Sequence, residues 1–528
     1  MFSRLKRFAA MIIFGGSILC TAFEWSGDPR QAMERDFDIL IDFMQRNSPR
    51  LTVNRKVYNV DIIKTLQEYR GRITGKETPA QFAELLKEAI LACHCGNLGL
   101  AWSSSETRWI DVSAGATVPK GEHAFGIFGQ VDPEISRIHR EYRSELRERT
   151  DPRFPGPPFF YWHGDYYTKH PFNWDGKTYE SGMKLLAVND RKPLELIRAN
   201  QHRMFMFDRD KKHFFGIPSS ELYEESPQLL LCRDGADKLT FRLLGRRGET
   251  VELTVDPNAF AAKNIELPPR EAGRTVTYFE DEGILYIRMP TMQDDKFYLD
   301  RLRQLSNLSG LRAAVIDIRD NPGGGDPVWM NLLGALLRDS CEVEFRLAFK
   351  SSPETDRLFP GKLETRKIGV LDNEKFGIFS TAWPIRVSPN SLKLKVPIYL
   401  LSRRISAAAG KMALAAANSK KVINVGERNP VECGEGGGSP INLYLPNSKL
   451  IVRMKLVINL LGNKRPEEFV FLETEKEYDP ALADLIAWYN PKSDISVRDR
   501  LFKTDPGIRA VMQEVDKKGA PASRRRPL

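Results

Sequence analysis

The stretch Ala313–Gly325, with the sequence AAVIDIRDNPGGG, decides how the rest of the chain is interpreted. Its first half, Ala313 to Ile318, is an apolar run interrupted by one aspartate, the pattern of a strand buried on both faces. Its second half is a turn that ends in three glycines, and glycines let backbone N–H groups approach a ligand because no Cβ blocks them. The apolar segment Pro327 to Leu337 predicts the next buried helix. A strand, a glycine turn and a helix can together direct amides at an anion or a developing oxyanion.

Taken alone, the glycine turn has two other interpretations. One is a plain tight connection in an α/β sheet. The other is an anion- or nucleotide-binding loop formed by Gly323–Gly325. The phosphate-loop pattern G-x-x-x-x-G-K-[ST] is absent, and neither Lys nor Arg follows the glycines. A second motif is therefore needed to decide between them.

That second motif lies further along the chain. The apolar run Val396–Leu401 predicts another buried strand, which continues into Ser402–Gly410 (SRRISAAAG) and an Ala-rich helix. The run Lys421–Glu427 (KVINVGE) predicts a third strand. Strands that alternate with helices in this way predict an α/β core.

Together the two motifs resemble the core of the C-terminal-processing (tail-specific) serine peptidases, a broad family that includes the tricorn-core and chlamydial secreted proteases. The resemblance covers roughly Thr275 to Pro480. It implies a ClpP/crotonase-like core, a mixed sheet with helices, and hydrolysis of peptide bonds. It implies a polypeptide substrate or peptide ligand, and neither a cofactor nor a metal.

The resemblance makes Ser406 the nucleophile, because it directly precedes the Ala-rich helix at a strand-to-helix turn. It also makes the backbone amides of Ala407, Gly323 and Gly324 the donors of the oxyanion hole. The alternative is that Ser406 only caps the helix, since serine is a favoured N-cap residue.

The general base is where this chain departs from the family. One branch carries Asp-Gly-His-Thr at the end of an N-terminal helical region, whereas Cys93–Leu100 here reads CHCGNLGL. Aligning the glycines puts Asn97 at the position of the family histidine, and an asparagine cannot accept a proton from a serine hydroxyl. His94 is the candidate base, with a core histidine between two cysteines as the alternative.

Any other histidine base must also come from outside the core, because Thr275 to Pro480 contains no histidine. Catalysis would then require two docked domains, with the site in the crevice between them. The remaining candidates are His123, His139, His163, His170, His202 and His213.

Two further departures concern the other catalytic groups. The family's second branch uses a Ser–Lys dyad, but Gly426–Gly434 contains no lysine, which excludes the dyad. Glu473 is the candidate orienting acid and Glu475 the second choice, with a solvated acidic face as the alternative. The family's acidic residue after the serine motif is replaced by Ala409. These departures support a second hypothesis, a catalytically inactive peptidase-like protein that binds peptides or scaffolds a partner.

The length of 528 residues is too great for one core and predicts about three domains. The net charge of +10 is concentrated partly in the two tails, and no basic stripe interleaved with aromatic residues suggests nucleic-acid binding. The oligomeric state is not predicted. The expected divisions are a signal peptide (1–22), an N-terminal helical domain (23–105), a β-rich region (106–265), the peptidase-like core (266–490) and a basic C-terminal tail (491–528).

The β-rich region resembles a degenerate PDZ-like module at about 158–257. Tyr179–Asn200 resembles the PDZ motif G-D-x-I-L-x-I-N-G followed by a helix, and Lys238–Val255 predicts a hairpin. PDZ modules bind peptides by strand addition. The alternative is a plain β-domain that contributes only packing.

The N-terminus has the pattern of an export signal. Arg4, Lys6 and Arg7 precede the apolar run Phe8–Leu19, which is too short to span a bilayer, and small residues follow at the cleavage position. A cleaved signal is expected, with an uncleaved anchor as the alternative, and the mature protein is expected in the periplasm or outside the cell. The five cysteines after the signal predict buried thiols or one disulfide. Cys93 and Cys95 lack the second cluster of a zinc site.

Overall fold

The computed structural model describes residues 25, 27–95, 98–101, 125–126, 133–147, 154–217, 222, 224–267, 273–305, 307–319, 321–358, 367–371, 374–403, 407–427, 431–432, 441–460, 471–472, 474–491 and 495–519. Three of the candidate site residues, Asn97, Ser406 and Glu473, lie outside the described residues. The predicted signal segment 1–22 and the candidate His123 also lie outside them.

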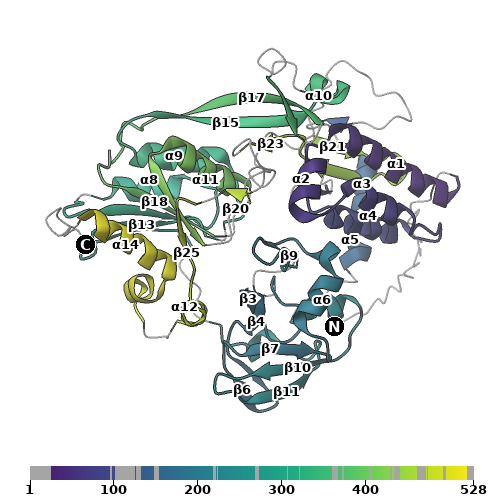
Figure 1. Ribbon diagram of the computed structural model, residues 1–528, viewed down its shortest axis with the longest axis horizontal. Helices are drawn as coiled ribbons and strands as arrows, with labels where there is room; N and C mark the ends of the chain where they lie inside the picture. Colours follow the sequence, from purple (N-terminus) through teal and green to yellow (C-terminus); the bar gives the residue numbers. More distant parts are fainter. Residues whose placement is uncertain are drawn as a thin grey trace, which may run out of the picture.

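The core is a six-stranded sheet in the order β12-β13-β14-β18-β19-β25 (Figure 1). β12 is antiparallel to β13, and the other neighbouring pairs are parallel. Every residue of β14 is buried, which confirms the prediction from its continuous apolar run. The strands are β12 (Thr275–Phe279), β13 (Ile284–Arg288), β14 (Ala313–Asp317), β18 (Ile398–Ser402), β19 (Val422–Glu427) and β25 (Lys476–Tyr478).

Helices cover both faces of this sheet. Because side chains alternate along a strand, Ala314 and Ile316 pack into one cluster, whereas Ala313 and Val315 pack into the other. The first cluster includes residues of α9 and α11, and the second includes residues of α14. The helices are α8 (Lys296–Arg303), α9 (Asp326–Leu336), α11 (Ala407–Ser419) and α14 (Pro506–Gly519).

α14 lies within the segment predicted as a basic tail. Residues 497–519 form α13 (Val497–Asp499), a π-helical turn (Arg500–Thr504) and α14. Ile508, Val511 and Val515 are buried against the sheet, and their spacing places them on one helix face. This part of the chain is therefore a component of the core, preceded by α12 (Leu482–Tyr489).

The N-terminal helices are completed by strands from far along the chain. Two of these strands form an antiparallel hairpin, β21 (Ile441–Tyr444) and β22 (Ile451–Met454). It lies in a four-stranded sheet with the order β1-β22-β21-β2, and its apolar residues share one cluster with those of α1 and α4. The remaining elements of this part are α1 (Pro29–Asn47), α2 (Arg50–Tyr58), α3 (Ile62–Arg70), α4 (Pro79–Ala92), α5 (Pro133–Arg147), β1 (Gly99–Leu100) and β2 (Phe125–Gly126).

The start of α4 is capped by two side-chain to backbone hydrogen bonds. The Thr78 hydroxyl accepts a hydrogen bond from the Gln81 N–H at 3.2 Å, and the Gln81 side chain accepts one from the Thr78 N–H at 2.8 Å. This reciprocal pair is a capping box, followed by Pro79 in the first turn.

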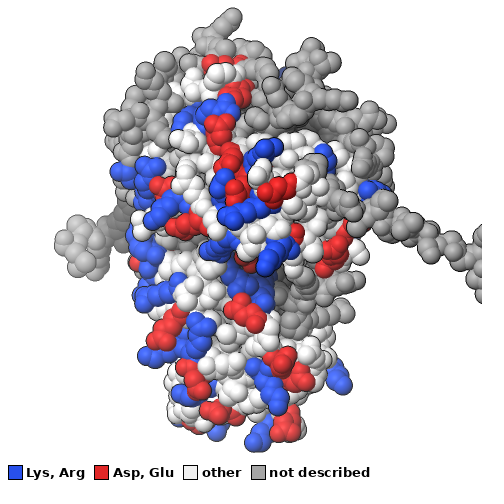
Figure 2. Space-filling model, turned by 90° about the vertical axis from the view of Figure 1, so that its right-hand side faces the viewer, with Lys and Arg blue, Asp and Glu red and all other residues white. Residues whose placement is uncertain are grey.

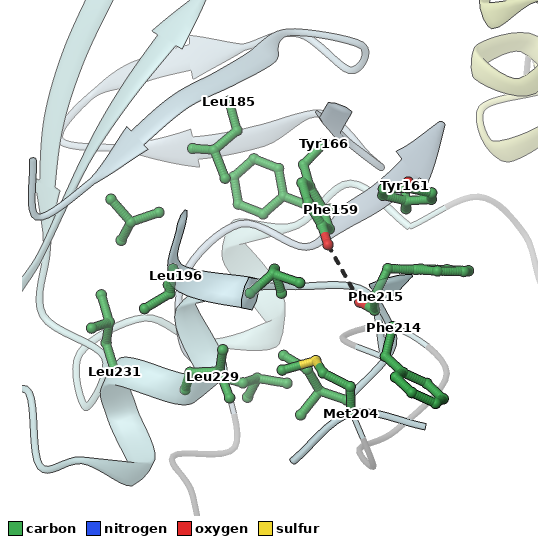
Figure 3. Packing of buried hydrophobic residues seen from close by; sticks show 14 of the residues in the cluster. Phe159, Tyr161, Tyr166, Leu185, Leu196, Met204, Phe214, Phe215, Leu229 and Leu231 are labelled. Carbon is green, nitrogen blue, oxygen red and sulfur yellow. Dashed lines mark hydrogen bonds between the residues drawn. The ribbon is translucent and has the colours of Figure 1, made fainter. Parts of the chain in front are cut away.

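The β-rich region forms a five-stranded sheet in the order β11-β10-β7-β4-β3. Figure 3 shows its core, where Phe159, Tyr166 and Leu185 of the strands pack with Leu196 and Leu229 of the helices. The hairpin predicted at 238–255 is confirmed as β10 and β11. The strands of the sheet are β3 (Phe159–Trp162), β4 (Asp165–Thr168), β7 (Lys184–Val188), β10 (Leu239–Leu244) and β11 (Thr250–Val255), and the helices are α6 (Pro193–Ala199) and α7 (Gln228–Arg233). Two small hairpins are formed by β5 (Phe172–Trp174) with β6 (Lys177–Tyr179) and by β8 (Phe207–Asp208) with β9 (His213–Phe214). Two 3₁₀ turns are Gln201–Arg203 and Ala262–Asn264.

A long antiparallel pair connects the core to the N-terminal helices (Figure 1). Its tip lies beside α1, where the Lys350 ammonium donates to the Gln45 carbonyl at 2.8 Å. The sheet has the order β16-β17-β15-β23. Its elements are β15 (Cys341–Lys350), α10 (Pro353–Leu358), β16 (Lys367–Leu371), β17 (Glu374–Ile385) and β23 (Ile458–Asn459), and a separate short pair is formed by β20 (Val431–Glu432) and β24 (Phe471–Leu472).

Charged residues of both signs are interspersed over the face shown in Figure 2, which is the pattern of a solvated surface. Among the described residues, no helix is both long and apolar enough to span a bilayer.

Candidate active site

The two motifs found in the sequence leave neighbouring parallel strands at the same edge of the core sheet. β14 pairs with β18, with Asp317 opposite Leu401, and the Ile318 N–H donates to the Leu401 carbonyl at 2.9 Å. Parallel neighbours place their carboxyl ends together, and the loops that follow such ends form the usual site of an α/β sheet. The glycine loop and the segment that contains Ser406 therefore begin side by side.

The glycine loop is fixed by the backbone of Met292. The Met292 N–H donates to the Gly323 carbonyl at 2.9 Å, and the Gly325 N–H donates to the Met292 carbonyl at 2.6 Å. Gly323 and Gly324 have φ values of 100° and 144°, which side chains rarely tolerate. A Cβ at Gly324 would overlap the Met292 carbonyl. Glycine is required here by both the backbone angle and the close approach.

The two predicted oxyanion donors of the loop differ in availability. The Gly323 N–H donates to the Asn321 side-chain oxygen at 2.7 Å, and the Asn321 amide donates to the Met289 carbonyl at 2.7 Å. The Gly324 N–H has no hydrogen-bond partner among the described residues. Gly324 is thus the donor that the loop leaves available, whereas Gly323 is occupied in holding the loop.

The serine segment ends where α11 begins. Ala407 is the first residue of α11, and the first N–H groups of a helix have no partner within the helix. The segment begins after Arg403, whose guanidinium donates to Glu427 at 2.9 Å and to the Tyr489 hydroxyl at 2.9 Å. These contacts fix Arg403, on the flank before the segment, at the carboxyl edge of the sheet.

The His94 ring lies in an aromatic cluster between the N-terminal helices and the β-rich region. It stacks on Phe214 with the ring centroids 3.7 Å apart and the planes 9° from parallel, and the Tyr58 ring lies 6.4 Å away. Burial lowers the pKa of His94 to about 3, although a backbone hydrogen bond with Met204 acts in the opposite direction. The buried Nδ1 has no hydrogen-bond partner among the described residues. The imidazole is therefore neutral in this stacked position.

The same cluster reaches the segment that carries Glu473. The Tyr58 ring lies 6.3 Å from Phe471 in β24. On the other side of Glu473, the Thr474 side chain occupies the space that a Cβ at Gly426, near the end of β19, would need. Phe471 thus lies beside the His94 cluster, and Thr474 lies near the carboxyl end of β19.

His163, one of the candidate bases, has a carboxylate partner that the sequence did not indicate. His163 lies in the turn between β3 and β4, and its Nε2 is 3.0 Å from Asp479, which directly follows β25. Because β25 is parallel to β19, Asp479 also lies at the carboxyl edge. The turn sequence His163-Gly164 between two aromatic strands was the available signal, but the partner is visible only in the tertiary structure.

The other described histidines are enclosed by the fold. Burial lowers the pKa of all four, and that of His170 falls to about 4. Three of them have a polar group within hydrogen-bonding distance: the Lys449 carbonyl for His139, the Asn490 side chain for His170 and the Tyr161 hydroxyl for His213. The fourth, His202, is half-buried.

The described residues contain no group of three or more side chains able to hold a metal ion. Within the described part of the chain, Cys93, Cys95, Cys232 and Cys341 form no disulfide, and Cys433 lies outside the described residues.

Comparison with known proteins supports the resemblance found in the sequence. Residues 283–455 match the model of peptidase family S41. Mature CPAF is similar in structure, with a TM-score of 0.54 and 13% identity over 93% of this chain and 99% of that chain. Mature CPAF complexed with lactacystin gives a TM-score of 0.52 and 12% identity over 93% and 98% of the two chains. Among curated proteins the chain has no match.

These likenesses show a mixed α/β fold with several sheets, similar to that of the S41 proteases. The family match supports a serine-protease-like function and suggests polypeptide substrates. The core at residues 283–455 therefore resembles peptidase family S41, and this match together with the similar fold supports a peptidase of the C-terminal-processing type.

Proposed function

We propose that this protein is an exported serine endopeptidase in which Ser406 attacks the peptide carbonyl. The N–H groups of Gly324 and Ala407 then stabilise the oxyanion. The observation that carries the proposal is that the glycine loop and the serine segment follow neighbouring strands at one sheet edge, with the Gly324 N–H unbonded among the described residues. Two amides from neighbouring loops are the arrangement that acyl transfer requires.

The proton acceptor is proposed to be one of two imidazoles. His94 can accept a proton only after it leaves its stack on Phe214, and Glu473 would then orient it. His163 is more exposed and already hydrogen-bonded to a carboxylate, the relation of a base to its orienting acid. Both belong to elements outside the core, so the proposed site depends on how these parts dock.

A fluorophosphonate probe tests the nucleophile. The purified wild-type protein should be labelled and should hydrolyse fluorescent casein, and Ser406→Ala should abolish both. Ser402→Ala is the matched control because Ser402, shortly before Ser406 in the sequence, has a buried hydroxyl at the end of β18. A folded wild-type protein that is not labelled would exclude the endopeptidase proposal. His94→Ala and His163→Ala then identify the base by which of them loses labelling.

The second candidate is an inactive peptidase-like protein that binds peptides or scaffolds a partner. The position of the His94 ring favours it, since burial lowers the pKa of this ring to about 3, and Asn97 replaces the family histidine. Under this proposal wild type and Ser406→Ala bind peptides equally, and Asn97→His creates no labelling. Labelling that appears only in Asn97→His would show that the rest of the site is intact.

The β-rich module is proposed to capture peptides by strand addition, as PDZ modules do. β3 and β11 are the edges of its sheet, and exposed and buried residues alternate in the second half of β11. Titration of full-length Ser406→Ala with extended peptides tests this proposal. An isotope-edited infrared signal of a new paired strand is expected, and binding without that signal would contradict strand addition.

Export is proposed from the N-terminal sequence. Expression of the full chain in a bacterial host should yield a periplasmic or secreted product that lacks about the first 22 residues. Intact mass after fractionation distinguishes this product from an uncleaved anchor.

A further inference from the structure

A buried cluster of one arginine and two aspartates connects the glycine loop to the C-terminal segment. Arg319 donates to Asp317 through Nε at 3.0 Å and through Nη2 at 2.6 Å. It donates to Asp505 through Nη1 at 2.8 Å and through Nη2 at 2.6 Å. The side chains of Arg319, Asp317 and Asp505 are only 6%, 1% and 0% exposed. The guanidinium is therefore held by two carboxylates at once.

Asp317 and Arg319 favour their charged forms despite their burial. Burial raises the pKa of Asp317, but the Arg319 guanidinium and a hydrogen bond from Tyr286 outweigh it and hold the pKa below its usual value. A buried guanidinium is stable only with such hydrogen-bonded partners, and removing one partner leaves an uncompensated charge. The orientation of Arg319 is thus set by both aspartates together.

Asp505 is itself held rigidly in the C-terminal segment. Its carboxylate accepts hydrogen bonds from the N–H groups of Gly507 at 2.9 Å and Ile508 at 3.1 Å, at the start of α14. Its own N–H donates to the Arg500 carbonyl at 3.0 Å. The bidentate contact to Arg319 spans 186 positions of the chain. Asp505 therefore connects the start of α14 to the residue that leads into the glycine loop.

Only a few residues of the chain separate Arg319 from Gly324. Asn321 lies two positions after Arg319. Its side chain donates a hydrogen bond to the Met289 carbonyl and accepts one from the Gly323 N–H. Gly324 comes next, and its N–H is the one left available. A shift of the backbone at Arg319 would therefore move the proposed oxyanion donor.

We propose that Asp505 is a positioning residue for the peptidase reaction: by fixing Arg319 it holds the Gly324 N–H where the oxyanion forms. This inference rests on the proposed function. Oxyanion stabilisation depends on donor position within about 0.5 Å. Substrate binding by other surfaces does not depend on this position. Loss of the Asp505 carboxylate should accordingly lower kcat and leave KM nearly unchanged.

Asp505→Asn is the principal test, since it removes the charge at nearly constant volume. Asp516→Asn is the matched control, because Asp516 is an exposed residue of α14 that pairs with Arg312 at the surface. With fluorescent casein, kcat should fall about tenfold or more in Asp505→Asn. KM should change less than about twofold, and fluorophosphonate labelling should slow in parallel with kcat. Asp516→Asn should match wild type, and Asp505→Glu should recover part of the loss.

Amide hydrogen exchange of the full-length variants separates this inference from the proposed function. Even if wild type is not labelled, Asp505→Asn should exchange faster in residues 321–325, with β14 unchanged. If Asp505→Asn does not fold, Arg319→Lys replaces it, since lysine keeps the charge but loses the bidentate contact. Unchanged loop exchange in the folded variant, or labelling as fast as in Asp516→Asn, would overturn the inference.

Discussion

The Lys411 ammonium lies 2.6 Å from the Asp326 carboxylate, and this ion pair joins α11 to the first residue of α9. α9 follows the glycine loop and α11 follows the serine segment, so the pair fixes the spacing between the two proposed halves of the oxyanion hole. Asp326 also accepts from the Trp329 indole at 3.1 Å, and Lys411 lies 5.2 Å from the centre of the Trp383 ring. The side chains are only 16% and 21% exposed, which limits solvent screening.

Lys411→Met should therefore reduce both stability and probe labelling. The substitution keeps the apolar stem but leaves Asp326 partly buried without its cation, at a cost of about 1–3 kcal/mol. Chemical denaturation measures the loss in free energy of unfolding. A double-mutant cycle with Asp326→Asn should give a coupling of about 1 kcal/mol. Strict additivity of the two changes would show that the pair contributes nothing.

Gly324→Ala and Gly325→Ala should behave differently although the residues are adjacent. At Gly324 the new methyl group meets the Met292 carbonyl at a φ of 144°, so a loss of about 2 kcal/mol or more and of labelling is expected. At Gly325 the φ is −88°, and the nearest atoms would lie 3.7 Å from the added Cβ, which is ordinary van der Waals contact. Thermal unfolding and labelling rates compare the two, and equal tolerance would contradict this description of the loop.

The buried His94 ring should make the folded protein lose stability as the pH falls. Its folded pKa of about 3 lies below the ordinary value of 6.5, so the unfolded state binds more protons between these values. Below about pH 6.5 this linkage costs about 1.4 kcal/mol per pH unit, down to about pH 3. Urea denaturation at pH 7, 6 and 5 should show a steeper fall for wild type than for His94→Asn. Parallel pH dependences of the two proteins would mean that the ring is not held neutral by burial.

Ile508→Ala should destabilise the core although the residue lies in a charged C-terminal segment. Ile508 is 1% exposed and packs on the sheet face opposite α9 and α11, so its truncation should cost about 2–4 kcal/mol. Met512→Ala is the matched control, because Met512 in the same helix is only partly buried. Equal thermal stability of both variants and wild type would indicate that α14 does not support the sheet.

Much of the core could be predicted because its signals are local. The apolar run Ala313–Ile318 predicts a strand with both faces covered, and Thr78-Pro79 predicts the start of α4 from capping alone. α14 could not be predicted in the same way. Its apolar residues are spaced among charges, and they have no burial partner until the sheet is assembled.

By itself the sequence determined the order of the core elements and the family, because strand burial, helix caps and glycine turns depend on neighbouring residues. Only the tertiary structure decided which atoms are available for chemistry. Gly323 and Gly324 are both glycines of one run, but among the described residues the Gly323 N–H is bonded to Asn321 and the Gly324 N–H has no partner. The His94 ring is likewise neutral only because Phe214, distant in sequence, excludes water from it. Hydrogen-bond occupancy and desolvation arise from the assembled packing, which no local stretch of sequence encodes.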